Sequence, residues 1–141
     1  MQIQRIQTLM LLIAAIITGI FCFVPFATVD AAAAADSATF VFAKDAPALL
    51  VLNITIALLL IILIFMYKNL RLQMRMTILS IVLLCASIVT GLFYIYVGFK
   101  GAEPILLGGI SLLVLAVLFA ILALRGMRKD HKTLTSYDRL R

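Results

Sequence analysis

The chain has 141 residues, of which 65% are hydrophobic and 13% are charged, and its formal net charge at pH 7 is +6. Soluble domains are only about half apolar, so this composition excludes an ordinary soluble globular fold. The length leaves room for one integral membrane domain over residues 1–141 and for no separate soluble domain.

Four apolar runs predict four transmembrane helices, over about residues 6–29, 47–67, 76–99 and 104–124. Each run has the ~20 residues that a helix needs to cross a hydrocarbon layer of ~30 Å. The few charged residues cluster between these runs, as expected where a charge in hydrocarbon costs several kcal/mol. The predicted fold class is an all-α membrane protein, a bundle of four transmembrane helices.

The first run could be mistaken for a signal peptide, because the alanine tract at residues 31–35 offers cleavage sites just after it. A signal-peptide core has only about 7 to 15 apolar residues, so we expect the helix to be retained. Pro25 should kink this helix or end it near its outer end. In the connection over residues 30–46, we expect the apolar group Phe40-Val-Phe42 to dip into the membrane interface or to cover the helix ends. A lid over a substrate or partner is the alternative.

The segment 68–75 separates the second and third runs and carries Lys68, Arg71 and Arg75 without any acid. It predicts a cytoplasmic turn between two spans, and residues 125–141 predict a basic cytoplasmic tail. This tail could contact the membrane or a partner groove, or it could only fix the topology. Helical spacing predicts one stripe in the tail that holds Met127, Leu134 and Tyr137.

Prolines and small residues mark helix starts and close packing. Pro47 and Pro104 suit the first turns of the second and fourth helices, because a proline nitrogen needs no hydrogen-bond partner there. Gly108-Gly109 permits the backbone to approach a neighbour closely. Small residues four positions apart favour close helix packing, and they occur as the pairs Ala15/Gly19, Ser87/Gly91 and Ala116/Ala120.

The basic residues predict which side of the membrane each connection occupies. Lys44 and Lys100 fall on one side, and by the positive-inside rule the other side, with both termini, is cytoplasmic. Because these charges flank membrane spans, we expect them to meet anionic lipid headgroups, and we expect no nucleic-acid partner. The cytoplasmic side receives ten of the twelve lysines and arginines: Arg5, Lys68, Arg71, Arg75, Arg125, Arg128, Lys129, Lys132, Arg139 and Arg141.

The apolar runs lack the side chains that membrane catalysis uses. No predicted helix carries an aspartate or glutamate, and proton-coupled export needs a buried acid. The single histidine, His131, stands among basic residues, where a solvated tail position is expected. We therefore expect no enzyme, no cofactor and no metal site.

Both ends of the chain and the basic turn resemble a known family. The residues that carry the resemblance are Ile3-Gln-Arg-Ile-Gln-Thr-Leu9, Arg71-Leu-Gln-Met-Arg75, Arg125-Gly-Met-Arg-Lys-Asp130 and Ser136-Tyr-Asp-Arg-Leu-Arg141. Together they resemble the bacterial membrane-protein family catalogued as domain of unknown function 4293, over essentially the whole chain. The resemblance implies a multi-pass protein of the bacterial inner (cytoplasmic) membrane with four helices, and it carries over no catalytic residue.

Two functions remain open from the sequence. The leading hypothesis is a non-enzymatic membrane subunit or scaffold that presents the basic turn and tail to a partner protein, within a larger membrane complex, or to anionic lipids. Its predicted contact residues are Lys68, Arg71, Arg75, Arg128, Lys129, Lys132, Tyr137, Asp138, Arg139, Leu140 and Arg141. The alternative is a small homo-oligomeric transporter or channel-forming subunit, with a polar path lined by Asn53, Thr55, Ser80, Ser87 and Thr90.

Overall fold

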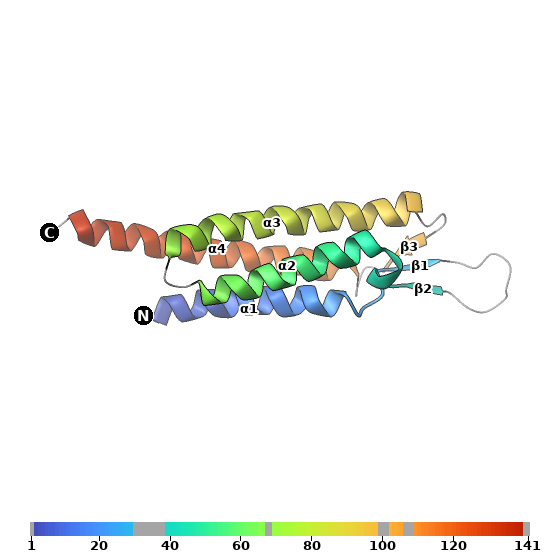
Figure 1. Cartoon of the computed structure of the whole chain (residues 1–141), viewed down its shortest axis with the longest axis horizontal. Helices are drawn as coiled ribbons and strands as arrows, with labels where there is room; N and C mark the ends of the chain where they lie inside the picture. Colours follow the sequence, from blue (N-terminus) through green and yellow to red (C-terminus); the bar gives the residue numbers. More distant parts are fainter. Residues whose placement is uncertain (1, 30–38, 67–68, 99–101, 106–108, 140–141) are drawn as a thin grey trace.

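The computed structural model describes residues 2–29, 39–66, 69–98, 102–105 and 109–139. These residues form four long helices that lie lengthwise beside one another (Figure 1): α1 (Gln2–Phe21), α2 (Pro47–Phe65), α3 (Leu70–Phe93) and α4 (Ile110–Arg139). α1 packs against α2 and α4, and α3 packs against the same two helices. Both ends of the chain lie at the same end of the molecule as the connection between α2 and α3 (Figure 1).

Within the described ranges, three helical stretches are long and apolar enough to cross a membrane: Pro47–Phe65, Leu70–Gly98 and Ile110–Ser136. The apolar part described for α1, Ile6–Phe21, is shorter. The prediction of membrane-spanning helices is therefore confirmed for three of the four.

α1 ends at Phe21 and not at residue 29 as predicted. Two turn hydrogen bonds close the helix, from the Cys22 nitrogen to the Gly19 oxygen (3.2 Å) and from the Phe23 nitrogen to the Ile20 oxygen (2.9 Å). Pro25 prevents its continuation, because proline has no N–H and disfavours the helical conformation of the residue before it. The chain then continues in an extended conformation.

α3 begins at Leu70, so most of the predicted turn at 68–75 is helix. The reason is the buried side chain of Gln73, whose Nε2 donates to the Leu63 carbonyl oxygen at 3.0 Å. The same carbonyl also accepts the Met66 N–H at 3.3 Å, so Gln73 gives it a second donor and brings the first turns of α3 against the end of α2. After Phe93 the helix continues as one π-helical segment, η2 (Tyr94–Gly98).

At the end opposite the termini, the described residues form three short strands (Figure 1): β1 (Ala27–Val29), β2 (Thr39–Val41) and β3 (Ala102–Pro104). β1 is central and antiparallel to both neighbours. The prediction of an all-α fold therefore missed a small sheet. This sheet joins the connection that follows α1 to the connection that follows α3.

The apolar group at residues 40–42 contributes to this sheet and not to a separate lid. Val41 of β2 pairs with Ala27 of β1 and is 4% exposed, whereas Phe40 is 55% exposed. The ring of Phe42 lies 5.0 Å from the Lys44 ammonium, at the start of the short 3-10 helix η1 (Ala43–Asp45).

Pro104 lies in strand β3 and does not open α4, which begins at Ile110. β3 is an edge strand, where a residue without an N–H is tolerated. A Cβ on Gly109 would lie 2.8 Å from both Cα and O of Phe26, so the predicted close backbone approach is confirmed at Gly109. Gly108 lies outside the described residues.

The buried positions of each helix recur at alternating intervals of four and three residues. Such a spacing keeps one face of a helix against its neighbours when helices run nearly parallel. The repeating positions are Gln7, Leu11, Ala14, Thr18 and Phe21 on α1, Leu49, Asn53, Ile56, Leu60 and Leu63 on α2, Gln73, Thr77, Ser80, Leu84, Ser87 and Gly91 on α3, and Leu113, Ala116, Ala120, Ala123 and Met127 on α4.

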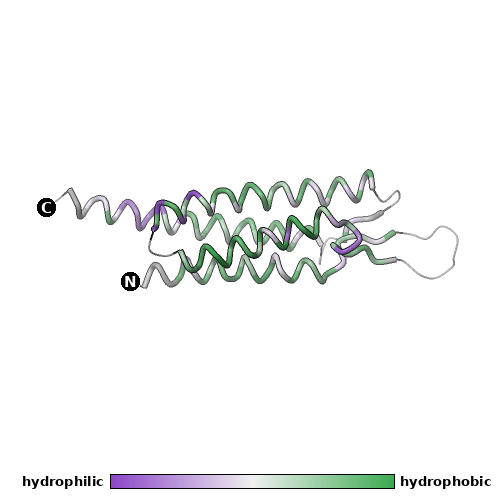
Figure 2. Tube along the Cα trace, in the orientation of Figure 1, coloured by the Kyte–Doolittle hydropathy of each residue, from purple (hydrophilic) through white to green (hydrophobic). Residues whose placement is uncertain are grey.

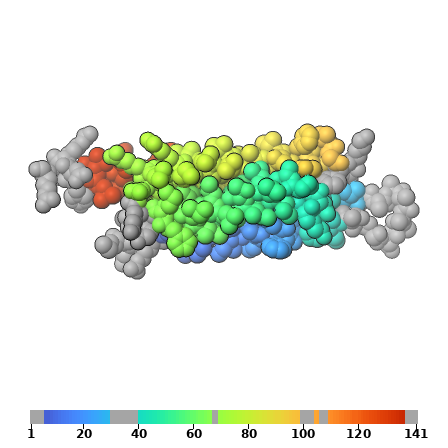
Figure 3. Space-filling view, viewed as in Figure 1, coloured from blue at the N-terminus to red at the C-terminus, as the bar shows by residue number. Residues whose placement is uncertain are grey.

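The four helices bury polar side chains and expose apolar ones. The buried polar side chains are Gln7, Thr18, Asn53, Gln73, Thr77, Ser80 and Ser87. Large apolar side chains face outward along the helices, among them Val51 and Leu58 on α2, and the middle of the molecule is strongly apolar along its length (Figure 2). Side chains of α2 and α3 pack together along these helices (Figure 3). An apolar exterior of this extent suits a hydrocarbon environment.

The predicted pairs of small residues fall mostly in helix contacts. Ala15, Ser87, Gly91, Ala116 and Ala120 are buried, which lets the helices approach closely. Gly19 differs, because a Cβ added there would meet no atom within 4 Å.

Candidate functional site

A hollow opens between the first turns of α3 and the last turns of α4, with a volume of about 840 Å³. This value is within the ~300–1,000 Å³ that is common for ligand pockets. Six of its lining residues are basic or imidazole side chains: Arg71, Arg75, Arg128, Lys129, His131 and Lys132. We call this hollow the basic pocket. Met74 and Ile78 of α3 complete the described lining.

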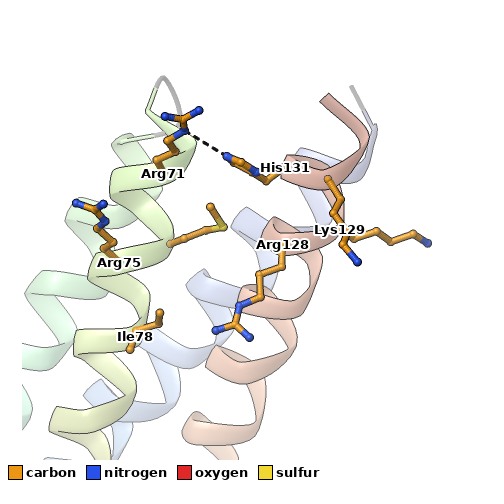
Figure 4. A pocket seen from close by; sticks show the side chains of 8 residues that line it. Arg71, Arg75, Ile78, Arg128, Lys129 and His131 are labelled. Atoms are coloured by element: carbon orange, nitrogen blue, oxygen red, sulfur yellow. Dashed lines mark hydrogen bonds between the residues drawn. The ribbon is translucent and has the colours of Figure 1, made fainter. Parts of the chain in front are cut away.

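The two helices contact each other across the basic pocket through Arg71 and His131. Arg71 Nε donates to His131 Nε2 at 3.3 Å, and Arg128 extends from α4 toward α3 (Figure 4). His131 is partly exposed, and the sequence did not reveal its contact with Arg71. The histidine uses only the Nε of Arg71. The two terminal nitrogens of the Arg71 guanidinium remain available to an anion.

Among the described residues that line the basic pocket, none is acidic. Asp130 lies between two pocket residues in sequence but turns to α1, where Gln7 Nε2 donates to its Oδ2 at 2.6 Å. Gly126 makes room for this contact, since a Cβ there would lie 2.9 Å from Gln7 Cγ. The carboxylate of Asp130 is thus directed to Gln7 of α1 and does not line the basic pocket.

Buried contacts hold the pocket helices in place. Thr77 Oγ1 of α3 lies 3.8 Å from the sulfur of Met127, which is fully buried. Met127 and Leu134 are seven residues apart on the continuous helix α4 and so share the predicted stripe; Met127 is buried between helices, whereas Leu134 is 56% exposed. The predicted tail is the helical continuation of α4, which projects past α2 and α3 (Figure 1).

The basic pocket brings together five of the predicted contact residues, Arg71, Arg75, Arg128, Lys129 and Lys132. Lys68, Leu140 and Arg141 lie outside the described residues. Tyr137, Asp138 and Arg139 belong to α4, but their side chains also lie outside the description.

Sequence reasoning missed several residues of this site. Met74 and Ile78 follow Arg71 at helical intervals, a signal that was hidden while residues 68–75 were expected to form a turn. The contact of Gln7 with Asp130 was also missed. Its signal was present, because both residues stand in segments that carry the family resemblance.

The five residues proposed for a polar path do not share one surface. Asn53, Ser80 and Ser87 are buried, Thr55 is exposed, and Thr90 lies between these extremes. Asn53 Nδ2 donates to Ser87 Oγ at 2.9 Å, and Ser87 Oγ lies 3.1 Å from Asn53 Oδ1. The hydroxyls of Ser80, Thr55 and Thr90 donate to carbonyls of their own helices. In the part of the chain that the structure describes, no three metal-ligating side chains gather.

Long helices with an apolar exterior, and with a few polar side chains buried in a mostly apolar interior, are typical of a helical membrane protein. The family model Domain of unknown function (DUF4293) matches residues 3–140, so the chain belongs to this family and the resemblance is confirmed. No curated protein and no solved structure matches the chain.

Proposed function

We propose that this chain is a four-span protein of the bacterial inner membrane that acts without catalysis, as a small subunit or scaffold. Both termini and the connection between α2 and α3 lie in the cytoplasm. There the basic pocket binds an anionic group, carried either by a partner protein or by lipid. The proposal rests on one observation, the grouping of basic residues of α3 and α4 around a pocket without a described acidic residue.

The distribution of charge supports this orientation. Polar colour gathers where α3 begins and α4 ends, and a second polar region lies near η1 at the opposite end (Figure 2). The first region holds the pocket residues, and the second holds Lys44 and Asp45. Retention of basic residues on the cytoplasmic side is the strongest determinant of membrane topology.

The length of α1 is compatible with a fourth span. Its 20 residues reach about 30 Å at ~1.5 Å per residue, and its apolar part, Ile6–Phe21, reaches about 24 Å; a bilayer adjusts to a span a few Å shorter than its ~30 Å hydrocarbon layer by thinning locally. Its outward face carries Leu9, Leu12 and Ile16, all more than 40% exposed, and therefore suits contact with lipid.

A transporter or channel has less support. Asn53 and Ser87 satisfy each other in the core, and Thr55 faces outward. Water or a solute would have to displace these internal bonds, and a polar path needs side chains that face a common lumen.

Two fusions test the orientation. A reporter that is active only in the cytoplasm should give signal when it is fused after Arg141, and none when it is inserted after Ala46. Signal from the insertion and none from the C-terminal fusion would reject the proposal.

A truncation tests the role of the tail. Deletion of residues 136–141 leaves every described lining residue of the basic pocket in place. If the tail contacts a partner protein, the truncated chain should lose that partner in an affinity pull-down from mild detergent, with unchanged topology and membrane level. Purification of the full chain as a homo-oligomer alone would favour the transporter hypothesis.

A further inference from the structure

We infer that the basic pocket is a binding site for an anionic phospholipid of the cytoplasmic leaflet, whose phosphodiester headgroup lies between α3 and α4. The inference deepens the proposed function and rests on its orientation of the chain. The proposed occupant of the pocket is a lipid and not an acidic protein.

The hydrogen-bond donors of the basic pocket suit a phosphate. Guanidinium groups bind phosphate oxygens through two parallel N–H bonds, and lysines add point charge. Arg128 extends from α4 toward α3, and Arg71 lies at the start of α3 with its Nε turned to His131 of α4 (Figure 4). Lys132 lies one helical turn beyond Arg128 and also lines the pocket. Asp130 directs its carboxylate to Gln7 of α1, so no acidic group among the described lining residues competes with a phosphate.

The position of the basic pocket along the helices also favours a lipid headgroup. It lies at the end of the apolar stretches of α3 and α4, where lipid headgroups meet a spanning helix. The N-terminal end of α3 adds the positive end of a helix dipole. Basic pockets between membrane helices on the cytoplasmic side are a usual place for anionic headgroups.

Exposed apolar residues beside the basic pocket distinguish a lipid from a soluble anion. Ile78 lines the basic pocket, yet it is 42% exposed. One turn deeper on the same face of α3 stands Val82, which is 58% exposed, and Ile121 lies two turns deeper than Arg128 on α4 and is 37% exposed. The charged pocket thus continues into an apolar surface along both helices. A lipid uses both parts, because its acyl chains follow its headgroup; a free phosphate or an acidic peptide uses only the charged part.

The test measures lipid retained by the purified full chain in detergent, by native mass spectrometry. The probes are phosphatidylglycerol and phosphatidylcholine with identical acyl chains, so that only the headgroup charge differs. The site variant is R128Q and its matched control is R125Q, because Arg125 is an exposed arginine on the same helix that does not line the pocket. A second comparison sets R71Q/R128Q against K44Q/R125Q, and each of these pairs removes two positive charges.

We expect the unmodified chain to retain phosphatidylglycerol in preference to phosphatidylcholine. R128Q should weaken retention about fivefold, the equivalent of about 1 kcal/mol for one basic residue near an anionic headgroup. R71Q/R128Q should weaken it roughly 25-fold if the two residues act independently. Both control variants should retain the lipid as the unmodified chain does.

Three results would overturn the inference: equal retention of both lipids, equal losses in the site and control variants, or binding of dissolved glycerol phosphate as tight as that of phosphatidylglycerol. The last result would assign the pocket to a soluble anion. If the reporter fusions still place the tail in the cytoplasm and a partner still depends on residues 136–141, the proposed function stands without the lipid. If the fusions reverse the orientation, both fall.

Discussion

At the scale of single residues, a buried pair joins α2 to α3. Asn53 is fully buried and bonds both to Ser87 and, through the same Nδ2 atom, to the Leu49 carbonyl oxygen at 2.8 Å. Hydrogen bonds between membrane helices contribute about 0.6 kcal/mol on average. Removal of one partner costs more stability than this, because the other partner is left buried without a hydrogen bond.

We therefore expect Asn53→Ala to lower the free energy of unfolding by about 1–2 kcal/mol, from a lost bond and an unpaired serine. Thr55→Ala is the matched control, because Thr55 is exposed and its hydroxyl bonds only to the Val51 carbonyl of its own helix. Unfolding of the purified chain in mixed detergent micelles measures both. Equal effects of the two variants would show that the Asn53–Ser87 contact contributes nothing specific.

A second contact at this scale depends on a missing side chain. Gly126→Ala places a Cβ 2.9 Å from Gln7 Cγ, so Gln7 must move and its bond to Asp130 must break. A hydrogen bond to a charged group contributes about 1.5–3 kcal/mol, and we expect a loss of stability at the lower end of that range.

Two variants act as controls for this prediction. Gly19→Ala should be neutral or stabilising by up to ~1 kcal/mol, because its Cβ meets no atom within 4 Å and alanine favours helix. In a Gln7→Ala background, Gly126→Ala should no longer destabilise. A cost that persists in that background would mean that the clash with Gln7 is not its cause.

At the scale of elements, the sheet and the start of α4 meet at a single close contact. Gly109 approaches the backbone of Phe26, and the Ile105 nitrogen donates to the Phe26 oxygen at 3.2 Å. Phe26 in turn donates its N–H to the Val41 oxygen at 2.9 Å. Phe26 thus connects strand β2, the residue that follows strand β3 and the residue that precedes α4.

Gly109→Ala should separate these elements, because its Cβ would meet backbone atoms at 2.8 Å that cannot rotate away as a side chain can. We expect a loss of more than about 2 kcal/mol, in the range typical of overpacking in a closely packed core. Hydrogen exchange should rise in β1 and β2 while the middle of α2 stays protected. Unchanged hydrogen exchange in both strands would contradict the prediction that the close contact of Gly109 with Phe26 holds the sheet against the start of α4.

At the scale of the whole molecule, the basic residues at one end are expected to hold the orientation together. Replacing Lys68, Arg71 and Arg75 by glutamine removes three of the ten basic residues on the proposed cytoplasmic side. This should weaken the orientation of α2 and α3, with Arg5 and the tail still acting on the rest.

The measurement is the labelling of a single cysteine placed at Asn69, in a chain with Cys22 and Cys85 replaced by alanine. We expect partial labelling from the outside in the triple variant and none in the unsubstituted background. If labelling does not change, these charges are redundant for topology and their role lies in the basic pocket.

Much of this protein could be predicted from local sequence. The apolar runs, the ends marked by Pro25 and Pro47, the family and the concentration of basic residues at one end all follow from the residues themselves. The reason is physical: the length of an apolar run decides whether a helix can cross a membrane, and charge is excluded from hydrocarbon wherever it stands in the chain.

Only the tertiary structure decided which faces are buried and which residues meet. Apolar residues dominate both the outer and the inner faces of the membrane helices, so hydropathy did not reveal that α3 turns Gln73, Thr77 and Ser80 inward. The basic pocket exists because α3 packs beside α4. The bond between Gln7 and Asp130, which directs that carboxylate to α1, joins residues 123 positions apart. Such contacts depend on the order in which the helices surround one another, and no local property of a uniformly apolar sequence contains that order.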